Sequence, residues 1–440
     1  MSALHEHAAK CQRLRIAFAS ARRAGSSVAL GKATSNLFRR RDRRGTKRID
    51  VRDFNYVLGV DHAKMTADVE GMTTYEDLVK ATLPHGLLPA VVPQLKTITA
   101  GGAVSGVGIE SSSFRYGLVH ESIEEMEVLT GNGDIVVCSR ERNPDLFFGF
   151  PNSYGTLGYA LRLKVPLIPA KRCVHLRHER FTDRARFFAL LEEMSKAAEI
   201  DYLDGTIFGR NEMYVTAGEF VDSAPRTSHY TYMRMYYGSI RRKEEDWLSA
   251  RDYIWRWDTD WFWCSKNLGA QNPLVRLLAT PWLLNSRTYQ RVMRLASRVL
   301  PQSKKVESVI QDVDIPIESA PRFFDFLMEE IGITPVWVCP FRAYDPNVVW
   351  PLFAVNPATL YINFGFWDVI PTTHEDGYFN RKVEQKAMDL GGRKGLYSTA
   401  WYDEKTFWML HNKPCYDQLK ARYDPDGVFR DLYAKCVKRR

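Results

Sequence analysis

The stretch of sequence that decides the fold covers residues 91–139, VVPQLKTITAGGAVSGVGIESSSFRYGLVHESIEEMEVLTGNGDIVVCS. It places four glycines, Gly101, Gly102, Gly106 and Gly108, within eight residues. Because glycine has no Cβ atom, such a backbone can pass very close to a bulky ligand. Its successive N–H groups can also form a concave site for a pyrophosphate. Taken alone, the glycine pattern predicts either a ligand cradle or a crowded turn.

The spacing of these glycines differs from that of a nicotinamide-binding Rossmann fold. The run GGAVSGVG is not followed by a plain helical pattern, and no acidic residue lies about twenty positions further on at the end of a strand. Two strands with a period of two are predicted instead at 123–129 and 134–138, joined by the hairpin sequence Gly131-Asn132-Gly133. This pattern argues against a Rossmann domain.

The N-terminal side of this stretch predicts an alternation of helices and strands. An amphipathic helix is expected at 6–24, with an apolar face of Leu, Phe and Ala. A short strand at 28–30 ends in GKATSN at 31–36, where small and polar residues predict a tight turn with exposed backbone N–H groups. A strand at 65–69 precedes a second helix, which Thr74 is expected to cap.

The C-terminal side predicts a second domain. NSYGTLG at 152–158 leads into a strand at 159–165, and Pro166 and Pro169 mark the end of the first domain. The predicted domains are therefore 1–170, 171–405 and 406–440, the last being a closing helix and tail. Expected in the second domain are a helix carrying Phe187, Leu190, Leu191 and Met194 and strands at 230–236, 336–338 and 360–364.

Length and composition describe a globular protein with more than one core. At 440 residues the chain is too long for one compact domain, and its 45% hydrophobic and 26% charged residues are ordinary values. The seven cysteines are scattered without a CxxC pair, and His120, His175 and His374 are isolated, so neither a disulfide framework nor a metal site is predicted. Without a visible signal peptide or an apolar run of about 18 residues, we expect a cytoplasmic protein.

The positive charge is concentrated at the N-terminal end. Residues 1–50 hold 13 Lys and Arg against 3 Asp and Glu, whereas the rest of the chain holds 48 basic and 49 acidic residues. Such an end suits an anionic partner, such as a dinucleotide phosphate or a phospholipid surface, and is equally compatible with a solvated loop at 39–48. No nucleic-acid recognition motif accompanies the charge, so nucleic acid is not expected as a partner.

Three motifs together resemble the flavoproteins of the vanillyl-alcohol oxidase type, whose FAD-binding domain is called PCMH-type. They are GKATSNLF at 31–38, PQLKTITAGGAVSGVGIESSSFRYG at 93–117 and NSYGTLGYALRL at 152–163. A closer resemblance to the Δ24-sterol reductase group is carried by GIESSSxxYGL, DLFxxxPxSxGTLGY, LIPAKR, QNPLVR and VWVCPF. TSNLFR and PQLKTIT are similar to a bacterial branch of that group, which reduces 10-methylene fatty acyl chains in the synthesis of tuberculostearic-type lipids.

The resemblance implies an α+β fold, with a PCMH-type FAD-binding domain of two subdomains and an α+β substrate, or cap, domain. The N-terminal flavin loop contains no His or Cys, so FAD is expected to bind non-covalently. The sterol reductases begin with a membrane-spanning helix that is not visible in this sequence. The residues implied to bind FAD are Lys32, Thr34, Ser35, Asn36, Gly101, Gly102, Gly106, Gly108, Ile109, Ser112, Ser113, Tyr116, Gly117, Gly155, Thr156, Gly158, Asn363 and Lys394.

Adding hydrogen across an unactivated carbon–carbon double bond needs a hydride donor and a proton donor. Reduced flavin would supply the hydride, and Glu110 in the glycine loop is the first candidate acid, because a partly buried carboxyl can stay protonated near neutral pH. A carboxylate that only braces the loop is the alternative. Tyr361, on the same strand face as Asn363, and Tyr397 are further catalytic candidates, and Lys394 is placed to hold the N1–C2=O region of the flavin.

A run of tryptophans and arginines lies between residues 251 and 287. Trp together with Arg on an amphipathic surface favours a membrane interface. The aromatic wall of a lipid tunnel and ordinary core packing are the alternatives. The residues are Trp255, Trp257, Trp261, Trp263 and Trp282, with Arg251, Arg256, Arg276 and Arg287.

The sequence therefore predicts an FAD-dependent oxidoreductase acting on CH–CH bonds. The expected reaction is reduction of a double bond in a methylene-fatty acyl chain of a phospholipid, or in a sterol side chain, with NADPH as the electron source. A lipid desaturase or oxidase working in the reverse direction and a flavin-free lipid-binding protein are the alternatives. Expected partners are the lipid, an anionic surface at the inner face of the cell membrane, and a methyltransferase that supplies the methylene lipid.

Overall fold

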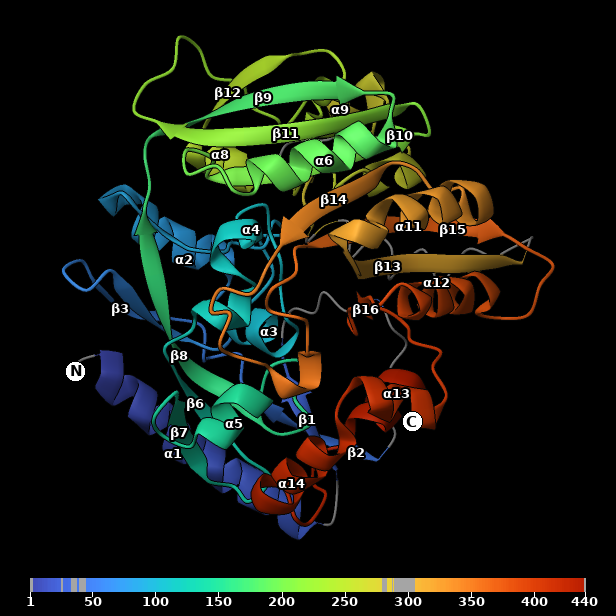
Figure 1. Cartoon of the computed structure of the whole chain (residues 1–440). Helices are drawn as coiled ribbons and strands as arrows, with labels where there is room; N and C mark the ends of the chain where they lie inside the picture. The colour runs from blue at the N-terminus through green and yellow to red at the C-terminus, as the bar shows by residue number, and fades with distance from the viewer. Residues whose placement is uncertain are drawn as a thin grey trace.

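The computed structural model describes residues 3–24, 27–32, 38, 45–278, 283–286, 288 and 305–438. Two large sheets organise these residues, and Figure 1 shows them in the lower and the upper half of the molecule. Strand β8 (Tyr159–Pro169) belongs to the lower sheet, and β9 (Cys173–Phe181), which follows it directly, belongs to the upper one. The mixture of helices and sheets confirms the predicted α+β class.

The lower half is built on a six-stranded sheet with the order β3-β4-β8-β6-β7 and with β5 beside the end of β8. All of its strand pairs are antiparallel, and the β6–β7 hairpin turns at the predicted Gly131-Asn132-Gly133. Its remaining strands are β3 (Val57–Asp61), β4 (Thr66–Glu70), β5 (Leu87–Pro89), β6 (Glu125–Leu129) and β7 (Ile135–Ser139).

Helix α1 (Ala3–Arg23) and the parallel strands β1 (Ser27–Gly31) and β2 (Thr46–Asp50) complete the lower half at the N-terminus. The helix is amphipathic as predicted. Leu14, Phe18 and Ala21 are buried in a core shared with β6 and β8, whereas Ala17, expected on the same face, is exposed.

The upper half is an eight-stranded antiparallel sheet with the order β12-β9-β11-β10-β14-β15-β13-β16. Helices α6 (Arg184–Met194), α11 (Ala320–Phe326) and α12 (Tyr378–Asp389) lie in front of it in Figure 1 and enclose a second hydrophobic core. Its strands beside β9 are β10 (Tyr202–Gly209), β11 (Glu212–Val221), β12 (Glu245–Ser249), β13 (Val306–Pro316), β14 (Val336–Phe341), β15 (Tyr361–Pro371) and β16 (Arg393–Lys394).

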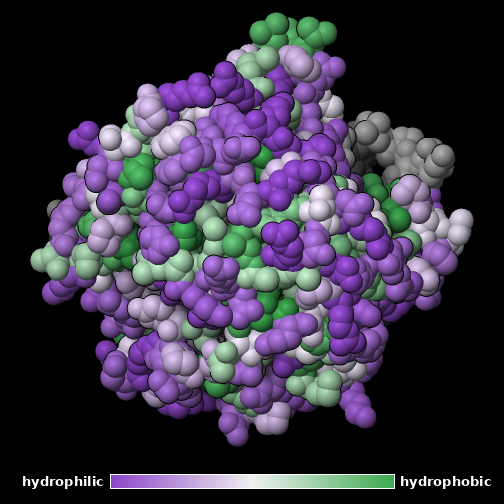
Figure 2. Space-filling model, turned by 45° about the horizontal axis from the view of Figure 1, so that its top comes forward, coloured by the Kyte–Doolittle hydropathy of each residue, from purple (hydrophilic) through white to green (hydrophobic). Residues whose placement is uncertain are grey.

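The other helices are short. None of the helices in the described part of the chain combines the length and the hydropathy that crossing a bilayer requires. Figure 2 shows a largely hydrophilic surface, with a group of hydrophobic side chains at its top edge. These helices are α2 (Tyr75–Thr82), α3 (Ala100–Ser105), α4 (Ser113–Tyr116), α5 (Pro144–Gly149), α7 (Tyr236–Ile240), α8 (Ala250–Ile254), α9 (Pro273–Leu278), α13 (Glu404–Leu410) and α14 (Lys413–Tyr423).

The glycine stretch differs from the open loop that the sequence predicts, because its first part is helix α3. Thr99 caps this helix, and its Oγ1 accepts a hydrogen bond of 3.3 Å from the Gly102 N–H. Gly101 lets α3 pack on the lower sheet, since a Cβ atom there would lie 2.9 Å from the Gly71 carbonyl oxygen and 3.3 Å from that of Ala160. A glycine inside a helix thus serves close packing rather than ligand approach.

Two expected elements differ from the structure. The strand predicted at 230–236 is wrong, because its alternating tyrosines are buried by aromatic packing between Tyr230 and Tyr236 rather than by strand pairing. Strand β8 continues to Pro169 instead of ending before Pro166. A proline is tolerated there because only alternate residues of an antiparallel strand donate N–H groups to a given neighbour.

The C-terminal segment returns to the lower half. The Val28 N–H donates to the Val428 carbonyl oxygen over 3.0 Å, and α14 lies against α5. Lys435 donates to the carbonyl oxygen of Tyr154 over 2.7 Å, and Lys420 donates to that of Thr156 over 3.2 Å. The two ends of the chain therefore share one half of the molecule.

We expect Glu70→Ala to lower the free energy of unfolding by about 3–5 kcal/mol, because it removes the carboxylate that binds the buried Lys10 and one of the two carboxylates that bind His7. Glu70 is fully buried in β4 and accepts hydrogen bonds of 2.8 Å from His7 and 2.9 Å from Lys10, which tie α1 to the sheet. Urea unfolding followed by circular dichroism measures the loss. The control Glu192→Ala removes an exposed pair with Lys196 and should cost less than about 1 kcal/mol. Equal losses in both variants would contradict the prediction.

Candidate functional site

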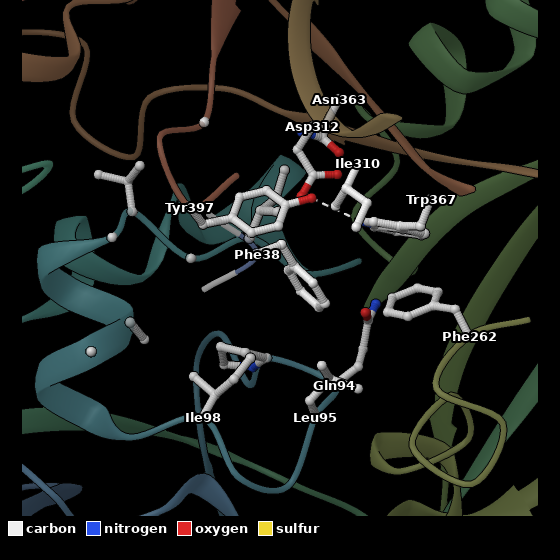
Figure 3. Close-up of a pocket in the computed structure, with 18 of the residues that line it drawn as sticks. Phe38, Gln94, Leu95, Ile98, Phe262, Ile310, Asp312, Asn363, Trp367 and Tyr397 are labelled. Carbon is white, nitrogen blue, oxygen red and sulfur yellow. Dashed lines mark hydrogen bonds between the residues drawn. The ribbon is translucent and has the colours of Figure 1, made fainter. Parts of the chain in front are cut away.

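A cavity of about 450 Å³ lies between the lower and the upper half. Residues 93–109 form the lower part of its wall, and β13, β14 and β15 contribute the upper part. Figure 3 shows Asp312, Asn363 and Tyr397 on one side of the cavity and Gln94, Leu95 and Ile98 on the other, with the ring of Phe38 between them. The labelled residues are Asp312, Asn363, Tyr397, Gln94, Leu95, Ile98, Ile310, Phe38, Phe262 and Trp367.

The glycines that follow the Thr99 cap supply one wall. Gly102, Gly106, Gly108 and Ile109 all line the cavity. An added Cβ atom on Gly102 would meet only the Thr99 Oγ1 within 4 Å, at 2.8 Å. A side chain longer than alanine at this position would therefore extend into the cavity, so the glycine keeps the space open for a ligand.

The opposite wall carries a pair of buried carboxyl groups. Asp312 and Asp314 lie two residues apart on β13, so both side chains face the cavity. Asn363 of β15, paired with Asp314 in the sheet, donates to the Asp314 Oδ1 over 2.8 Å. Tyr397 lies beside Asp312, and its hydroxyl accepts a hydrogen bond of 2.8 Å from the Trp367 indole, the dashed line in Figure 3.

Burial raises the pKa of both carboxyl groups, so that each can be protonated and neutral near physiological pH. Burial raises the pKa of Asp312 to about 7, the nearby Asp314 raises it as well, and Tyr397 and Lys394 act in the opposite direction. Burial also raises the pKa of Asp314 to about 7, although the hydrogen bond from Asn363 opposes this. A carboxyl group with such a pKa can hold or release a proton near neutral pH.

Aromatic and aliphatic side chains complete the wall. Phe38 and Trp261 stack at 5.6 Å between ring centroids, and Phe262 and Trp367 approach to 4.5 Å. The branched aliphatic residues are Leu95, Ile98, Val107, Ile109, Leu118, Ile310 and Val369. A site that is apolar apart from a few convergent polar groups suits a ligand with a planar ring or a hydrocarbon chain.

Seven of the predicted site residues line this cavity. The structure brings lower-half glycines and a lysine together with Asn363 and Tyr397. These two residues lie more than 250 positions after the glycines in the sequence. Thr34, Ser35 and Asn36, predicted beside Lys32, lie outside the described residues. The seven are Lys32, Gly102, Gly106, Gly108, Ile109, Asn363 and Tyr397.

The other predicted FAD-binding residues of the lower half lie behind the cavity wall. Ser112 donates to the Ala90 carbonyl oxygen over 2.7 Å, and the Ser113 hydroxyl accepts from the Glu110 N–H over 3.1 Å. Both serines are buried, as is Gly101. Tyr116 and Gly117 end helix α4, while Gly155, Thr156 and Gly158 form the turn before β8, where the Gly155 and Thr156 carbonyl oxygens bind lysines of the C-terminal segment.

Glu110 belongs to a buried ion cluster and not to the cavity wall. Its carboxylate lies 3.3 Å from Arg256, which also binds Asp204 over 2.8 Å, and Ser111 donates to it over 2.8 Å. Burial raises the pKa of Glu110, although the charge of Arg256 opposes the shift. The Trp337 indole donates to Asp204 over 3.2 Å and itself lines the cavity, so the cluster supports the wall from behind.

Tyr361 and Lys394 also lie behind the wall. Tyr361 stacks on Phe341, and its hydroxyl accepts a hydrogen bond of 3.0 Å from the Asn356 N–H. Lys394 is buried in β16, donates to the Thr399 carbonyl oxygen over 2.9 Å and lies 3.6 Å from Glu384. Neither residue is part of the cavity lining.

Sequence reasoning missed the two carboxyl groups of β13 and the glutamine and tryptophan that accompany them. Asp312 and Asp314 alternate with Val313 and Ile315 in the strand VESVIQDVDIP, at positions that share one face. That period of two was the available signal. Gln94 and Trp367 carried no comparable signal, because only the packing of the two halves brings them to the cavity.

The residues present fit an FAD molecule. The Oδ1 atoms of Asp312 and Asn363 are buried and have no hydrogen-bond partner among the described residues. An isoalloxazine ring offers both N–H and carbonyl groups along its edge and apolar faces that suit the aromatic and aliphatic walls. The open space at Gly102 and the cation of Lys32 suit the rest of the cofactor.

We expect Asp312→Asn to stabilise the protein at about pH 8 by roughly 4 kcal/mol, and to change little at about pH 4. The folded pKa of about 7 exceeds the ordinary value of 3.8, so the folded chain binds more protons than the unfolded chain between these values. Stability therefore falls as the pH rises through this window, by about 1.4 kcal/mol per pH unit for each such carboxyl, and Asn removes one contribution. Urea unfolding at several pH values measures the slope.

The control for this experiment is Asp222→Asn. Asp222 is exposed, with 84% of its side chain accessible, so its replacement should leave the pH dependence of unfolding unchanged. An Asp312→Asn variant with the same slope as the wild type would contradict the raised pKa.

Comparison with known proteins agrees with this geometry. Residues 8–139 match the family model described as FAD binding domain. The human Delta(24)-sterol reductase is 26% identical over 397 residues, which cover 87% of this chain and 76% of the relative. The Arabidopsis thaliana Delta(24)-sterol reductase is 23% identical over 444 residues, covering 89% and 77%.

A relative with another name shares a shorter region. The cytokinin dehydrogenase 7 of Oryza sativa subsp. japonica is 31% identical over 187 residues, which cover 42% of this chain and 34% of that protein. The matched FAD-binding region includes the glycine stretch that lines the cavity and confirms the predicted PCMH-type domain. The chain is therefore an FAD-dependent oxidoreductase with an FAD-binding domain at its N-terminal end, and it is homologous to the Delta(24)-sterol reductases over most of its length.

Proposed function

We propose that the protein reduces a carbon–carbon double bond in a long-chain lipid. The observation that carries the proposal is the combination, in one apolar cavity, of an opened glycine wall and a carboxyl group with a pKa of about 7. The proposed substrates are a methylene-fatty acyl chain of a phospholipid or a sterol side chain. The name of the homologous Delta(24)-sterol reductases supports a reductase of this substrate class.

The chain's own residues would divide the work between binding and proton transfer. We propose that the backbone at Gly102, Gly106 and Gly108 and the side chains of Lys32 and Asn363 hold FAD. When bound and reduced, FAD supplies a hydride. The aromatic and aliphatic wall excludes water and orients the hydrocarbon chain of the substrate.

Asp312 is our candidate for the proton donor. It lines the cavity with an unpaired Oδ1 atom, whereas Glu110, the candidate from the sequence, is bound to Arg256 behind the wall. The Asp312 carboxyl would give its proton to one alkene carbon, and a hydride of the kind that bound FAD supplies would complete the second C–H bond, so that two C–H bonds would replace the π bond. Tyr397 and Asp314 would position the carboxyl, because they adjoin it in the wall.

We also propose an electron source and partners for this reaction. NADPH is the proposed donor that returns FAD to its reduced form. A methylene group on an acyl chain arises when a methyl group is transferred to an unsaturated chain, so a methyltransferase would supply the substrate. We propose that the protein works in the cytoplasm at the inner face of the cell membrane, where phospholipid substrates lie.

The direction of hydrogen transfer is tested under anaerobic conditions. We expect NADPH to bleach the flavin absorbance near 450 nm, as reduced flavins lose this band, and an alkene-bearing phospholipid to restore it with formation of the saturated product. Bleaching by a saturated lipid instead would support a desaturase. A purified protein without flavin colour after FAD addition would support a flavin-free lipid-binding protein.

We expect Gly102→Val to purify as a folded protein with little or no bound FAD. The valine side chain would extend into the cavity beyond Thr99 and occupy the space proposed for the cofactor. The FAD content is measured from the ratio of flavin to protein absorbance, and the fold by circular dichroism. Gly59→Val in β3 is the matched control, because a Cβ atom there meets nothing within 4 Å. Full FAD content in Gly102→Val would contradict the proposed binding wall.

We expect Asp312→Asn to bind FAD and to be reduced by NADPH at nearly the wild-type rate. The alkene should then reoxidise it roughly 100-fold or more slowly, the usual contribution of a positioned general acid. In the wild type this rate should fall as the pH rises above about 7, because the acid loses its proton. Anaerobic stopped-flow absorbance measures both half-reactions.

Glu110→Gln and Tyr397→Phe are the companion variants for this test. Glu110→Gln should leave reoxidation by the alkene within about threefold of the wild type if the residue only braces the wall. Slow reoxidation in Glu110→Gln together with normal reoxidation in Asp312→Asn would identify Glu110 as the proton donor. Slow reoxidation in Tyr397→Phe together with normal reoxidation in Asp312→Asn would identify Tyr397 instead.

A further inference from the structure

The tryptophans that the sequence places at a membrane surface are not on the surface. Trp255, Trp257 and Trp263 are buried in the hydrophobic core, and Trp261 is partly buried in the cavity wall. Trp282 lies outside the described residues. Core packing and an aromatic cavity wall therefore account for the described tryptophans. They do not form a surface for lipid contact.

Helix α9 has its polarity inverted relative to an ordinary surface helix. Leu274, Leu277 and Leu278 are 71%, 63% and 84% exposed, and Val275 is 42% exposed. Arg276, the charged residue of this helix, is 1% exposed. A helix on the surface of a soluble domain normally turns its apolar residues inward and its charges outward. We call these four exposed apolar residues the leucine face.

A buried ion pair holds α9 in this orientation. The Arg276 guanidinium binds Asp260, which is also buried, and donates to the Tyr232 carbonyl oxygen over 2.6 Å. The Tyr232 hydroxyl in turn donates to the Leu277 carbonyl oxygen over 3.0 Å. Because Arg276 is fixed at several points, the leucine face is a defined surface and not a consequence of a loose helix.

The segment that carries the leucine face and the segment around Tyr232, which contacts it, contain no acidic residue. The sequence contains no Asp or Glu from 261 to 278 and from 225 to 243, although the chain has 52 acidic residues among 440. The second of these stretches adds Met233, 41% exposed, and the exposed Arg234 beside Tyr232. Figure 1 places α9 at the upper end of the molecule. An apolar surface with basic and without acidic neighbours complements an anionic bilayer.

The leucine face is connected to the cavity through the same segment of chain. Trp261, Phe262 and Cys264, which precede α9, line the cavity. Trp261 also contacts a small apolar cluster of Ala270 and Leu284, together with Tyr232. A bilayer in contact with the leucine face would thus lie next to the chain segment that forms part of the cavity wall.

We propose that the leucine face of α9 is a membrane-docking surface that inserts into the headgroup and acyl boundary of an anionic phospholipid bilayer. The proposal rests on the proposed function only for its purpose, which is access to an acyl chain of a membrane lipid. The partner is the bilayer itself and not a second protein. Peripheral contact of this kind needs no membrane-spanning helix.

The test is sedimentation of the full-length, FAD-loaded protein with vesicles of phosphatidylcholine mixed with phosphatidylglycerol. We expect the triple variant Leu274→Gln, Leu277→Gln, Leu278→Gln to lose roughly tenfold or more of its vesicle partitioning, because insertion scales with buried apolar area. The control Tyr344→Gln, Val349→Gln, Met409→Gln changes three exposed apolar residues outside both the leucine face and the basic N-terminal end, and should partition like the wild type. Equal partitioning of both triple variants and the wild type would overturn the proposal.

Salt separates insertion from charge attraction. The basic N-terminal end also attracts anionic lipid, but at about 1 M salt this attraction is screened within about 3 Å. We expect the wild type to keep part of its binding there and the leucine-face variant to keep almost none. Complete loss of wild-type binding at high salt would show that charge alone holds the protein on vesicles, which contradicts insertion.

A measurement on the unmodified chain keeps the test independent of the variants' folding. Vesicles should slow backbone hydrogen exchange in the peptide containing 273–278 and leave the peptide containing α6 unchanged. Unchanged exchange in α9 would overturn the proposal, as would a leucine-face variant that loses a dimer in light scattering while still binding vesicles. Vesicle binding without alkene reduction would contradict the proposed function alone, and reduction of a detergent-dispersed lipid without vesicle binding would contradict the docking surface alone.

Discussion

The antiparallel pairing of β13 with β15 is the interaction on which the candidate site depends. Eleven consecutive residue pairs fix the register, so that Asp314 lies opposite Asn363 and Asp312 lies opposite Gly365. A slip by one residue would turn both carboxyl groups to the other face of the sheet, because side chains alternate along a strand. Gly365 leaves room for this arrangement, since a Cβ atom there would lie 2.6 Å from the Asp312 Oδ1.

Local sequence patterns predicted those elements whose signals are themselves local. The Gly131-Asn132-Gly133 hairpin, the Thr74 cap and the apolar face of α1 each depend on residues within a few positions of one another. The strand expected at 230–236 failed because alternating tyrosines satisfy a strand pattern and an aromatic core equally well. Strand order in the upper sheet joins β10 to β14, whose paired residues Gly205 and Val338 lie 133 positions apart, and no local pattern encodes it.

The site was predictable only where local sequence patterns identify its residues. The glycine pattern identified the lower wall, and the alternation along residues 361–363 identified Asn363. Glu110 and Asp312 were not distinguishable from the sequence, because the environment of a carboxyl group depends on what packs against it. Arg256 lies 146 positions from Glu110, and Tyr397 lies 85 positions from Asp312. Those distant neighbours decide which acid is paired with a cation and which faces an apolar cavity.

The return of the C-terminal segment to the lower half has a consequence for the order in which the protein forms during synthesis. Backbone and lysine contacts join Val28 to Val428 and residues 154–156 to Lys420 and Lys435, so the lower half lacks part of its own structure until the final residues leave the ribosome. The upper sheet occupies one continuous stretch, from Cys173 to Lys394, and is complete earlier. Closing contacts over some 400 residues is slow, because loop entropy is lost before those contacts form. The half that emerges first is thus the last to gain its full set of contacts.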